Sequence, residues 1–435
     1  MRLRIEGGAR LSGLYTPQGA KNEALQVLAA ALLTEEPVEI DNLPDIADVR
    51  QQLALIAYLG AQVERLEANR VRITAKTLLP EALLSPEGRQ IFRSLRGSVL
   101  IVGPLLARCG EAYLPRPGGD KIGRRRVDTH LLGLQQLGAV VTYDDKAEVY
   151  RLAAPRRLRG TYLLLEEASV TGTANLLMAA ALAEGRTTLY HAACEPYIQQ
   201  LGALLERMGA PIEGLGTNRL TIEGQPVLKG AYHRLLPDII EIGSLIGLAA
   251  MTQSTLRLAP VPKEHLPPIL QPFRRLGIPI AEKENALEVY GPAVYEPQTL
   301  ADGDILTISD HTWPGTPPDL LSVLLVVATQ ADGPVLIHQK MFESRLFFVD
   351  RLIEMGARVV LCDPHRALVI GLGRRAPLRG IRMSSPDIRA GMALLIAALS
   401  AEGQSIIEQA EQIERGYERI EERLSALGAR IYREE

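Results

Sequence analysis

The chain has 435 residues, of which 47% are hydrophobic and 23% charged, and its formal net charge at pH 7 is -3. This composition excludes a disordered protein and argues against a general nucleic-acid binder. The length predicts roughly two or three domains, and because aromatic residues make up only 4% of the chain, we expect aliphatic cores.

The first eight residues contain no apolar stretch, so no signal peptide is visible. No apolar run approaches the roughly 18 residues that a membrane-spanning helix needs. The three cysteines, Cys109, Cys194 and Cys362, are scattered without a metal-binding or disulfide pattern, which fits a reducing compartment. We therefore expect a cytoplasmic protein that has no metal site and binds neither nucleic acid nor a membrane. We also expect it to be a monomer without a cofactor.

Along the chain, a helical pattern that ends in a glycine and leads into a strand recurs six times, about every 70 residues. Glycine is the usual residue just after a helix, because it adopts left-handed backbone angles easily. In chain order these glycines are Gly60, Gly138, Gly209, Gly277, Gly356 and Gly428.

Six segments that are apolar on almost all sides alternate with these patterns. They are residues 24–33, 99–107, 175–183, 243–251, 320–328 and 390–400. A helix without a polar face must be buried on every side. We therefore predict an α/β protein of six units, each with one buried helix, one amphipathic helix and several strands, grouped three and three into two domains.

Polar and charged residues gather where each buried segment begins. In chain order they are Lys21 and Asn22, Arg96, Ser169 with Thr171 and Thr173, Asp238 with Glu241, Asp319, and Asp387 with Arg389. Helix N-termini attract anions through their free N–H groups and the helix dipole. If the buried helices of each domain run parallel, their starts converge, and two such domains face to face would bind a multiply charged anionic substrate.

A glycine-rich loop from Pro117 to Gly123 carries a single carboxylate, Asp120, just before three arginines, Arg124, Arg125 and Arg126. Glycines let the loop move or approach a ligand closely, and arginines bind phosphate and carboxylate groups through paired hydrogen bonds. This arrangement indicates proton transfer to an anionic substrate.

With these residues in view, the chain resembles the enolpyruvyl transferases over essentially its whole length. The matching motifs are residues 19–25, 95–98 with 103–105, 118–128, 170–173, 314–315 with 318–319, 342–345, 387–391 and 415–418. The resemblance implies a two-domain inside-out α/β barrel of six βαβαββ-type repeats, three per domain, that closes around its substrates. One domain would span residues 21–235 and contain a mobile catalytic loop at about 115–126, and the other would combine 1–20 with 236–435.

The resemblance also implies the reaction. The enolpyruvyl group of phosphoenolpyruvate passes to the 3′-hydroxyl of UDP-N-acetylglucosamine, and phosphate leaves, by addition and then elimination. This is the first committed step of peptidoglycan synthesis. Two alternatives stay open, namely the sister reaction on shikimate 3-phosphate and a non-catalytic protein that only binds a UDP-sugar.

The roles implied by the family divide into two sets. The catalytic set is Asp120, Lys21, Asp319 and Arg415. The substrate-binding set adds Asn22, Arg96, Arg125, Arg126, Val127, Asp128, Thr129, Ser169, Val170, Thr171, Met341, Arg345, Asp387 and Arg389. Asp319 would take the proton of the 3′-hydroxyl, and Lys21 would contact phosphoenolpyruvate.

Taken without the family, several of these residues have simpler interpretations. Lys21 could be a solvated lysine, although a lysine in a first helical turn is unfavourable without an anion nearby. Asn22 and Ser169 could be ordinary helix caps, and Asp319 could merely compensate a helix dipole. Arg125 could belong to a plain basic turn.

Asp120 stands where most of the family carries cysteine, so the resemblance makes it the general acid for the methylene carbon. A free aspartate has a pKa of about 3.9, and we therefore expect loop closure to desolvate Asp120 and raise its pKa. Fosfomycin alkylates the family cysteine. A carboxylate is a poorer nucleophile, so we expect this chain to resist that drug.

Overall fold

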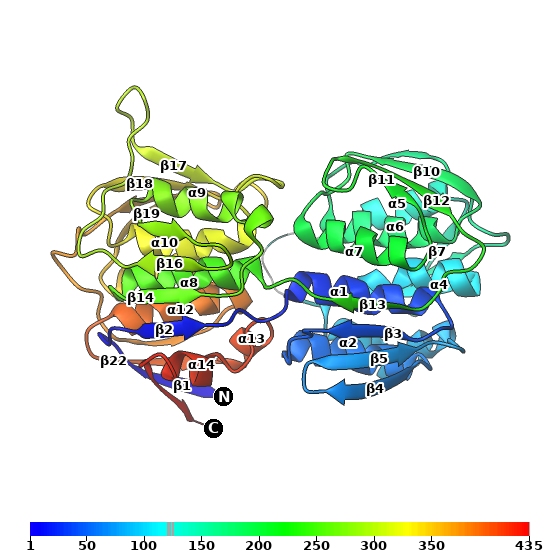
Figure 1. The fold of residues 1–435 in the computed structure, drawn as a ribbon, viewed down its shortest axis with the longest axis horizontal. Coiled ribbons are helices and arrows are strands. Elements are labelled where there is room, and N and C mark those ends of the chain that lie inside the picture. Colours follow the sequence, from blue (N-terminus) through cyan, green and yellow to red (C-terminus); the bar gives the residue numbers. More distant parts are fainter. Residues whose placement is uncertain (120–122, 124–125, 435) are drawn as a thin grey trace. The chain divides into compact units, whose positions relative to one another are not determined.

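The chain forms two compact units in a computed structural model that describes residues 1–119, 123 and 126–434 (Figure 1). Unit 1 consists of residues 1–18, 123 and 237–434, and unit 2 consists of residues 19–119 and 126–236. The loop acid Asp120 and the arginines Arg124 and Arg125 lie outside the described residues.

The elements of unit 1 surround three long apolar helices. Its helices are α8 (Ile239–Met251), α9 (Pro267–Arg275), α10 (Leu321–Ala328), α11 (Val349–Glu354), α12 (Ile388–Ser400), α13 (Glu411–Glu414) and α14 (Ile420–Ser425), with 3-10 turns η4 (Lys263–His265) and η5 (Pro318–Leu320). Its strands are β1 (Arg2–Glu6), β2 (Ser12–Tyr15), β14 (Thr255–Leu258), β15 (Ile280–Glu282), β16 (Leu287–Tyr290), β17 (Leu306–Ser309), β18 (Pro334–His338), β19 (Arg358–Asp363), β20 (Arg366–Ile370), β21 (Arg382–Ser384), β22 (Gln404–Glu408) and β23 (Arg430–Glu434).

Unit 2 repeats the same plan. Its helices are α1 (Lys21–Ala30), α2 (Ala47–Tyr58), α3 (Pro86–Arg93), α4 (Val102–Cys109), α5 (Asp128–Gln136), α6 (Val170–Ala181) and α7 (Pro196–Arg207), with 3-10 turns η1 (Ala31–Leu33), η2 (Pro80–Leu84) and η3 (Arg96–Ile101). Its strands are β3 (Val38–Asp41), β4 (Gln62–Glu67), β5 (Arg70–Thr74), β6 (Glu111–Pro115), β7 (Val140–Asp144), β8 (Val149–Ala153), β9 (Tyr162–Leu164), β10 (Gly185–Tyr190), β11 (Ile212–Glu213), β12 (Arg219–Gly224) and β13 (Ala231–Arg234).

The described strands form six small sheets, three in each unit. In unit 1 the strand orders are β21-β22-β1-β23, β15-β16-β14-β2 and β17-β18-β20-β19. In unit 2 they are β13-β3-β5-β4, β6-β8-β7 and β11-β12-β10-β9. Five of the sheets contain one parallel pair of strands. In each parallel pair, one strand precedes a buried helix and the other follows a buried helix, as β17 and β18 do. The other strand pairs are antiparallel. The predicted α/β class and the six-fold repeat are therefore confirmed.

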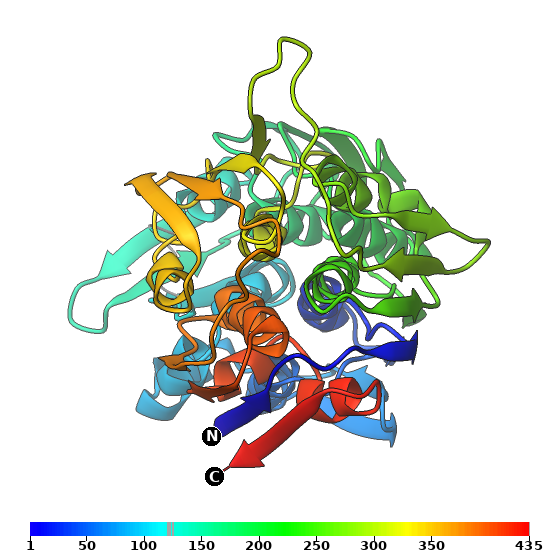
Figure 2. The same ribbon diagram turned by 90° about the vertical axis from the view of Figure 1, so that its left-hand side faces the viewer.

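Buried helices form the centre of unit 1. Every residue of α8 and of α10 is buried, and α8, α10 and α12 all pack against one another. Figure 2 shows these three helices nearly end-on, with the strands of the sheets outside them. Because helices occupy the centre and sheets the outside, the unit has the inside-out arrangement that the apolar segments predicted.

The six predicted glycines all end helices or helical turns in the left-handed backbone region. Their φ angles are 99° at Gly60, 106° at Gly138, Gly209 and Gly428, 90° at Gly277 and 100° at Gly356. A side chain at these positions would be strained, which explains why glycine recurs there.

Two of the repeats exchange their buried helices between the units. Strand β2 pairs with β14 of unit 1, but the chain then enters α1 of unit 2. Strand β13 pairs with β3 of unit 2, but the chain then enters α8 of unit 1. In the other repeats that open on such a strand, the strand and its helix belong to one unit, as β9 and α6 do.

A buried glutamate anchors each connecting segment. In unit 1, Glu241 accepts hydrogen bonds from the backbone N–H of Gln18 at 2.7 Å and from Arg423 Nη1 at 2.6 Å. In unit 2, Glu23 accepts a hydrogen bond from the backbone N–H of Leu236 at 3.3 Å. Burial raises the pKa of Glu241, and Arg423 opposes that effect. Both glutamates are the third residue of their helix. Equivalent positions in the two units therefore accept a backbone hydrogen bond from the connecting segment.

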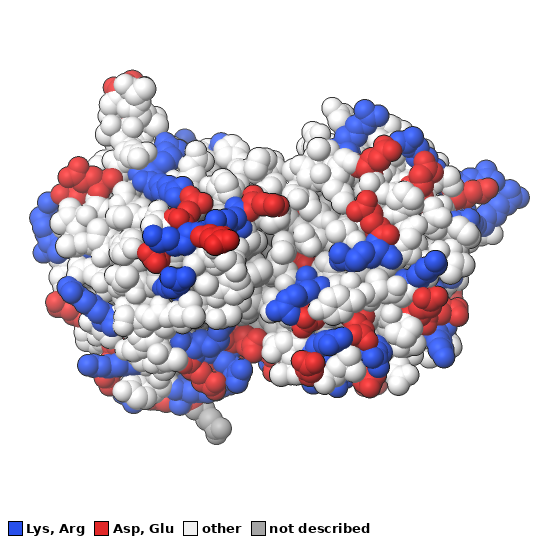
Figure 3. Space-filling view, in the orientation of Figure 1, with Lys and Arg blue, Asp and Glu red and all other residues white. Residues whose placement is uncertain are grey.

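Charges of both signs are interspersed on the face that Figure 3 shows, without a large area of one sign. Among the described residues, no helix is long and apolar enough to cross a membrane.

Candidate active site

The predicted residues of unit 2 cluster at the starts of its buried helices. Lys21 opens α1, and its Nζ lies 2.7 Å from Oδ2 of Asp48, in the first turn of α2. Both side chains are almost fully buried. From the sequence we expected an external anion beside a lysine at this position, whereas the chain itself supplies an anion in Asp48. Asn22, the second residue of α1, is half-buried, and the cap position of that helix belongs to Ala20.

A second group joins the start of η3 to the start of α5. Arg96 opens η3, and its Nη2 donates a hydrogen bond to the carbonyl oxygen of Arg126 at 3.2 Å. Arg126 Nε in turn lies 2.6 Å from Oδ2 of Asp128, the first residue of α5, and Val127 occupies the cap position. The structure therefore brings Arg96 together with the segment that follows the loop.

A third group lies at the start of α6. Ser169 caps this helix by accepting a hydrogen bond from the N–H of Gly172 at 3.2 Å, so the capping interpretation of Ser169 is confirmed. Thr129 of α5 donates to Glu167 Oε1 at 3.3 Å, just before that cap. Val170 and Thr171 form the first turn of α6, where backbone N–H groups favour an anion.

In unit 1 the predicted residues converge on one carboxylate. Asp319 lies in η5, where its Oδ1 accepts a hydrogen bond from Arg345 Nη2 at 2.7 Å. Its Oδ2 lies 3.1 Å from Arg389 Nε and 3.0 Å from Arg389 Nη2. The Asp319 side chain is 21% exposed, whereas those of Arg345 and Arg389 are 7% and 6% exposed. The Asp319 carboxylate lies between two buried cations but is partly exposed, so it remains accessible to a ligand.

Arg389 has a second, buried contact. Its Nη1 donates a hydrogen bond to the hydroxyl of Tyr417 at 3.2 Å, and that hydroxyl lies 2.9 Å from Ser244 Oγ. Burial alone would lower the pKa of Arg389, but Asp319 and the other neighbours raise it above its ordinary value, so the guanidinium stays charged. Asp387 caps α12 by accepting hydrogen bonds from the backbone N–H of Arg389 and of the next residue.

The last two predicted residues of unit 1 lie on turns. Arg415 follows α13, and its Nη1 donates a hydrogen bond to Gln412 Oε1 at 3.0 Å. Met341 is 39% exposed, and its backbone N–H lies 3.3 Å from Oδ2 of the buried Asp310. Burial raises the pKa of Asp310, and backbone hydrogen bonds from this turn oppose that rise.

Sequence reasoning missed the residues that hold these groups in place. Asp48, Tyr417 and His130 are buried polar side chains that contact predicted residues, and each comes from an amphipathic element or a loop. A polar residue on an otherwise buried helix face was the available signal, since buried polar groups are almost always paired.

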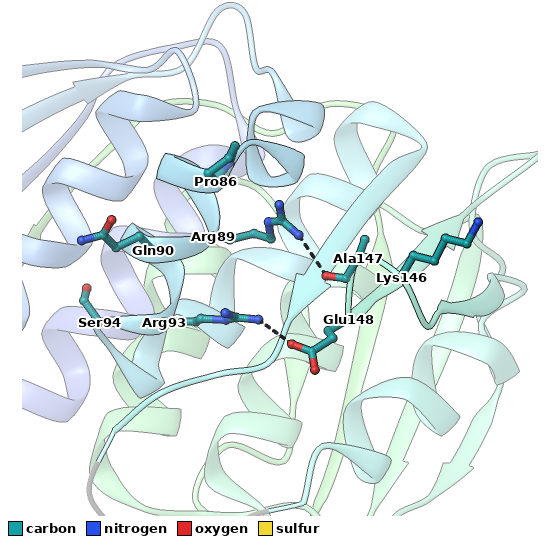
Figure 4. Close-up of a pocket in the computed structure, with 8 residues that line it drawn as sticks. All are labelled: Pro86, Arg89, Gln90, Arg93, Ser94, Lys146, Ala147 and Glu148. Carbon is teal, nitrogen blue, oxygen red and sulfur yellow. Dashed lines mark hydrogen bonds and ion pairs between the residues drawn. The ribbon is translucent and has the colours of Figure 1, made fainter.

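A surface hollow on unit 2 lies apart from the predicted residues (Figure 4). It is lined by Pro86, Arg89, Gln90, Arg93, Ser94, Lys146, Ala147 and Glu148. Two of its cations already have protein acceptors, because Arg89 donates to the Ala147 carbonyl and Arg93 pairs with Glu148. The described residues contain no cluster of three or more histidine, cysteine or acidic side chains that could hold a metal ion.

The chain is similar to a known protein family and to several named relatives. The family model described as EPSP synthase (3-phosphoshikimate 1-carboxyvinyltransferase) matches residues 5–424. The UDP-N-acetylglucosamine 1-carboxyvinyltransferase of Porphyromonas gingivalis is 57% identical over 429 residues, which are 99% of both chains. The proteins of the same name from Bacteroides thetaiotaomicron and Bradyrhizobium diazoefficiens are 56% and 52% identical over 99% of this chain and over 99% and 97% of their own.

Solved structures show the same fold at lower identity. The enolpyruvyl transferase NikO from Streptomyces tendae has a TM-score of 0.85 and 24% identity, over 99% of this chain and 98% of its own. An EPSP synthase from Acinetobacter baumannii has a TM-score of 0.74 and 17% identity, over 99% of both chains.

Proposed function

Because the chain belongs to the EPSP synthase family of enolpyruvyl transferases, we propose that it transfers the enolpyruvyl group of phosphoenolpyruvate to the 3′-hydroxyl of UDP-N-acetylglucosamine, with release of phosphate. The observation that carries this assignment is the 57% identity over 99% of both chains to an enzyme named for that reaction. The reaction is the first committed step of peptidoglycan synthesis, and so serves cell-wall growth, cell shape and cell division.

The reaction needs three proton transfers and several cationic partners. In the addition step, a proton bonds to the methylene carbon of phosphoenolpyruvate, and the 3′-oxygen bonds to its central carbon while losing its own proton. In the elimination step, the methyl carbon gives up a proton and the bond to the phosphate oxygen breaks. We assign the proton donor to Asp120, which lies outside the described residues, and the 3′-hydroxyl base to Asp319.

The contacts of Asp319 support this role. Three guanidinium nitrogens surround its two oxygens, which fixes the carboxylate in one orientation, while a fifth of the side chain stays accessible. Positioned carboxylates act as general bases when they reach the proton that they remove. In the same unit, Arg345, Arg389 and Arg415 supply positive charge for anionic groups, and Asp387 and Met341 complete the substrate contacts of this unit.

Unit 2 contributes the second set of contacts to the same pair of substrates. Lys21, with Arg96 and Arg125, binds the phosphate and carboxylate of phosphoenolpyruvate, and Asp48 holds the Lys21 ammonium in place. Asn22 binds the sugar. The diphosphate and uridine are bound by Ser169, Val170 and Thr171 together with Arg126, Val127, Asp128 and Thr129.

We propose that residues 21–235 and residues 1–20 with 236–435 act as the two domains that close around the substrates. The two compact units, with their helix exchange between β2 and α1, support this division. We propose that the protein acts in the cytoplasm, which agrees with three free cysteines, and that it acts as a monomer. Size-exclusion chromatography with light scattering would test the monomer.

Acceptor preference tests the function against its nearest competitor. Purified protein with phosphoenolpyruvate is offered UDP-N-acetylglucosamine or shikimate 3-phosphate, and phosphate release is followed. The proposal expects release with the UDP-sugar alone. Release with shikimate 3-phosphate would assign the sister reaction instead, and binding of the UDP-sugar without release would identify a non-catalytic protein.

A further inference from the structure

A buried chain of hydrogen bonds connects the starts of three helices in unit 2. Asn175, on α6, accepts a hydrogen bond at Oδ1 from the backbone N–H of Gly103 on α4, at 2.6 Å. Its Nδ2 lies 3.0 Å from the carbonyl oxygen of Val99 and 3.0 Å from Nδ1 of His130 on α5. His130 Nε2 then lies 3.2 Å from Oγ1 of Thr171, back on α6. This series of hydrogen bonds therefore ends at Thr171, a residue that we place at the diphosphate.

The chemistry of the donors and acceptors fixes the direction of every hydrogen bond in this series. A backbone N–H can only donate and a carbonyl oxygen can only accept, so Gly103 and Val99 together determine which end of the Asn175 amide is oxygen. The second proton on Asn175 Nδ2 then requires His130 Nδ1 to accept. The ring proton of neutral His130 must consequently lie on Nε2, which donates to Thr171 Oγ1.

His130 stays neutral in this environment. Its side chain is 1% exposed, and burial, with a smaller contribution from Arg96, lowers its pKa to about 3. The imidazole thus has one proton to give at neutral pH, and Thr171 receives it. The Thr171 hydroxyl is then left with its own proton to donate elsewhere.

The Thr171 hydroxyl differs in this respect from the hydroxyls of Ser244 and Thr252, on α8 and at its end. Ser244 and Thr252 donate back to the carbonyl oxygen four residues earlier, at 2.9 Å and 2.7 Å. In the part of the chain that the structure describes, Thr171 Oγ1 makes its hydrogen bond to His130. Thr171 is also half-exposed and lies in the first turn of α6, beside backbone N–H groups that favour an anion.

We propose that His130 is a positioning residue for the sugar nucleotide, which holds the Thr171 hydroxyl so that its proton is donated to a diphosphate oxygen. The proposal rests on the proposed function, since it takes the diphosphate of a UDP-sugar as the acceptor. In this proposal, Asn175 and Gly103 determine which ring nitrogen of His130 carries the proton. A side chain at Gly103 would collide with Asn175, because a Cβ there would lie 2.5 Å from Oδ1.

A purely structural role for His130 predicts a different outcome from the positioning role. If the histidine only packs three helices together, its loss would lower stability and leave the Thr171 hydroxyl equally useful. If it positions Thr171, losing either residue would weaken UDP-N-acetylglucosamine binding by a similar factor, and losing both would cost little more than losing one.

The experiment measures UDP-N-acetylglucosamine affinity by titration calorimetry, without phosphoenolpyruvate, for the wild type, Thr171→Val, Thr171→Ser, His130→Leu, His130→Gln and the Thr171→Val/His130→Leu double variant. A hydrogen bond to a charged group corresponds to about tenfold or more in Kd, so Thr171→Val and His130→Leu should each weaken binding by about that factor. Thr171→Ser and His130→Gln keep the donors and should stay within about threefold of the wild type. Thr187→Val is the matched control, because the Thr187 hydroxyl is buried and has no hydrogen-bond partner among the described residues.

Unchanged affinity in Thr171→Val, or additive losses in the double variant, would overturn the proposal. If His130→Leu does not fold, the proposal remains falsifiable, because an affinity of Thr171→Val equal to that of the wild type would still overturn it. Phosphate release by the wild type is measured separately, so a protein that binds the UDP-sugar without turnover would refute the function while the affinity series still tests His130. A wild type that does not bind UDP-N-acetylglucosamine would refute both.

Discussion

Arg389 holds Asp319 through two of its nitrogens, Nε at 3.1 Å and Nη2 at 3.0 Å from the same carboxylate oxygen. The two residues are 70 positions apart and were assigned different tasks from the sequence, one as a base and the other as an anion contact. Their contact couples these tasks, because the cation that orients the base also carries charge available to a substrate. Binding and proton removal should therefore respond together when either residue changes.

Replacing Asp319 by asparagine tests this coupling. The amide keeps the size of the carboxylate but cannot take a proton, so we expect kcat to fall by at least about a hundredfold, the usual contribution of a general base. Steady-state kinetics measures the effect. Asp332→Asn is the matched control, since Asp332 pairs with Arg375 on the surface, and its kcat should not change. A kcat for Asp319→Asn within about threefold of the wild type would refute the base assignment.

Removing the side chain of Asp319 altogether should also destabilise unit 1. Asp319→Ala leaves the buried cations Arg345 and Arg389 without this carboxylate, and breaking a buried pair commonly costs about 3–5 kcal/mol. Because Asp319 is partly exposed, we expect the lower end of that range. Denaturant unfolding measures it, and Asp319→Asn should lose less. Equal stability of the alanine variant and the wild type would show that the arginines do not depend on Asp319.

The sequence predicted the helical core well and the polar contacts poorly. The segment predicted at 320–328 is α10 with the end of η5, and 390–400 falls within α12, because apolar residues on every side leave only one possible environment. The Asp48 partner of Lys21 was missed. It depends on how α2 packs against α1, and no local pattern encodes that packing.

The start of the loop that we propose to be catalytic leaves no room for a side chain. A Cβ on Gly118 would lie 1.7 Å from the carbonyl oxygen of Arg93, at the end of α3. Gly118→Ala must therefore displace the loop backbone, and we expect kcat to fall by about tenfold or more with little change in UDP-N-acetylglucosamine affinity. Gly185→Ala is the control, because its Cβ would meet open space and only its left-handed backbone is strained, at about 1 kcal/mol. A normal kcat in Gly118→Ala would show that the loop position does not matter for catalysis.

Asp120→Asn should nearly abolish turnover, because an amide cannot protonate the methylene carbon of phosphoenolpyruvate. Asp120→Cys is the informative companion. It should keep activity and become irreversibly inhibited by fosfomycin, whereas the wild type should recover when the drug is removed, since a thiolate is the better nucleophile. Activity assays before and after dialysis distinguish the two. Lasting inhibition of the wild type would contradict the role of the carboxylate in resistance.

Two buried histidines should make unit 2 sensitive to acid. Burial, with Arg96 and Arg207 as the respective smaller contributors, lowers the pKa of His130 to about 3 and that of His233 to about 4. An unfolded histidine has a pKa of about 6.5, so below that pH the unfolded chain binds protons that the folded chain excludes. The contribution of the two neutral histidines to the free energy of unfolding is therefore complete above about pH 6.5. It is lost as the pH falls, by up to about 1.4 kcal/mol per pH unit for each histidine.

Urea unfolding of the wild type and of His130→Gln at pH 7 and pH 5 measures this effect. The variant lacks one titrating group, so its stability should depend less steeply on pH. Identical pH dependence in the two proteins would show that His130 is not held neutral in the folded state.

The product of a single turnover tests the central assignment most directly. The purified protein is mixed with UDP-N-acetylglucosamine and phosphoenolpyruvate labelled with 13C at its central carbon, and the products are followed by 13C and 31P NMR. The proposed function predicts one inorganic phosphate for each labelled enol ether, with the ether carbon bonded to the 3′-oxygen of the sugar. Unreacted phosphoenolpyruvate beside bound UDP-N-acetylglucosamine, or an ether at any other oxygen, would contradict it.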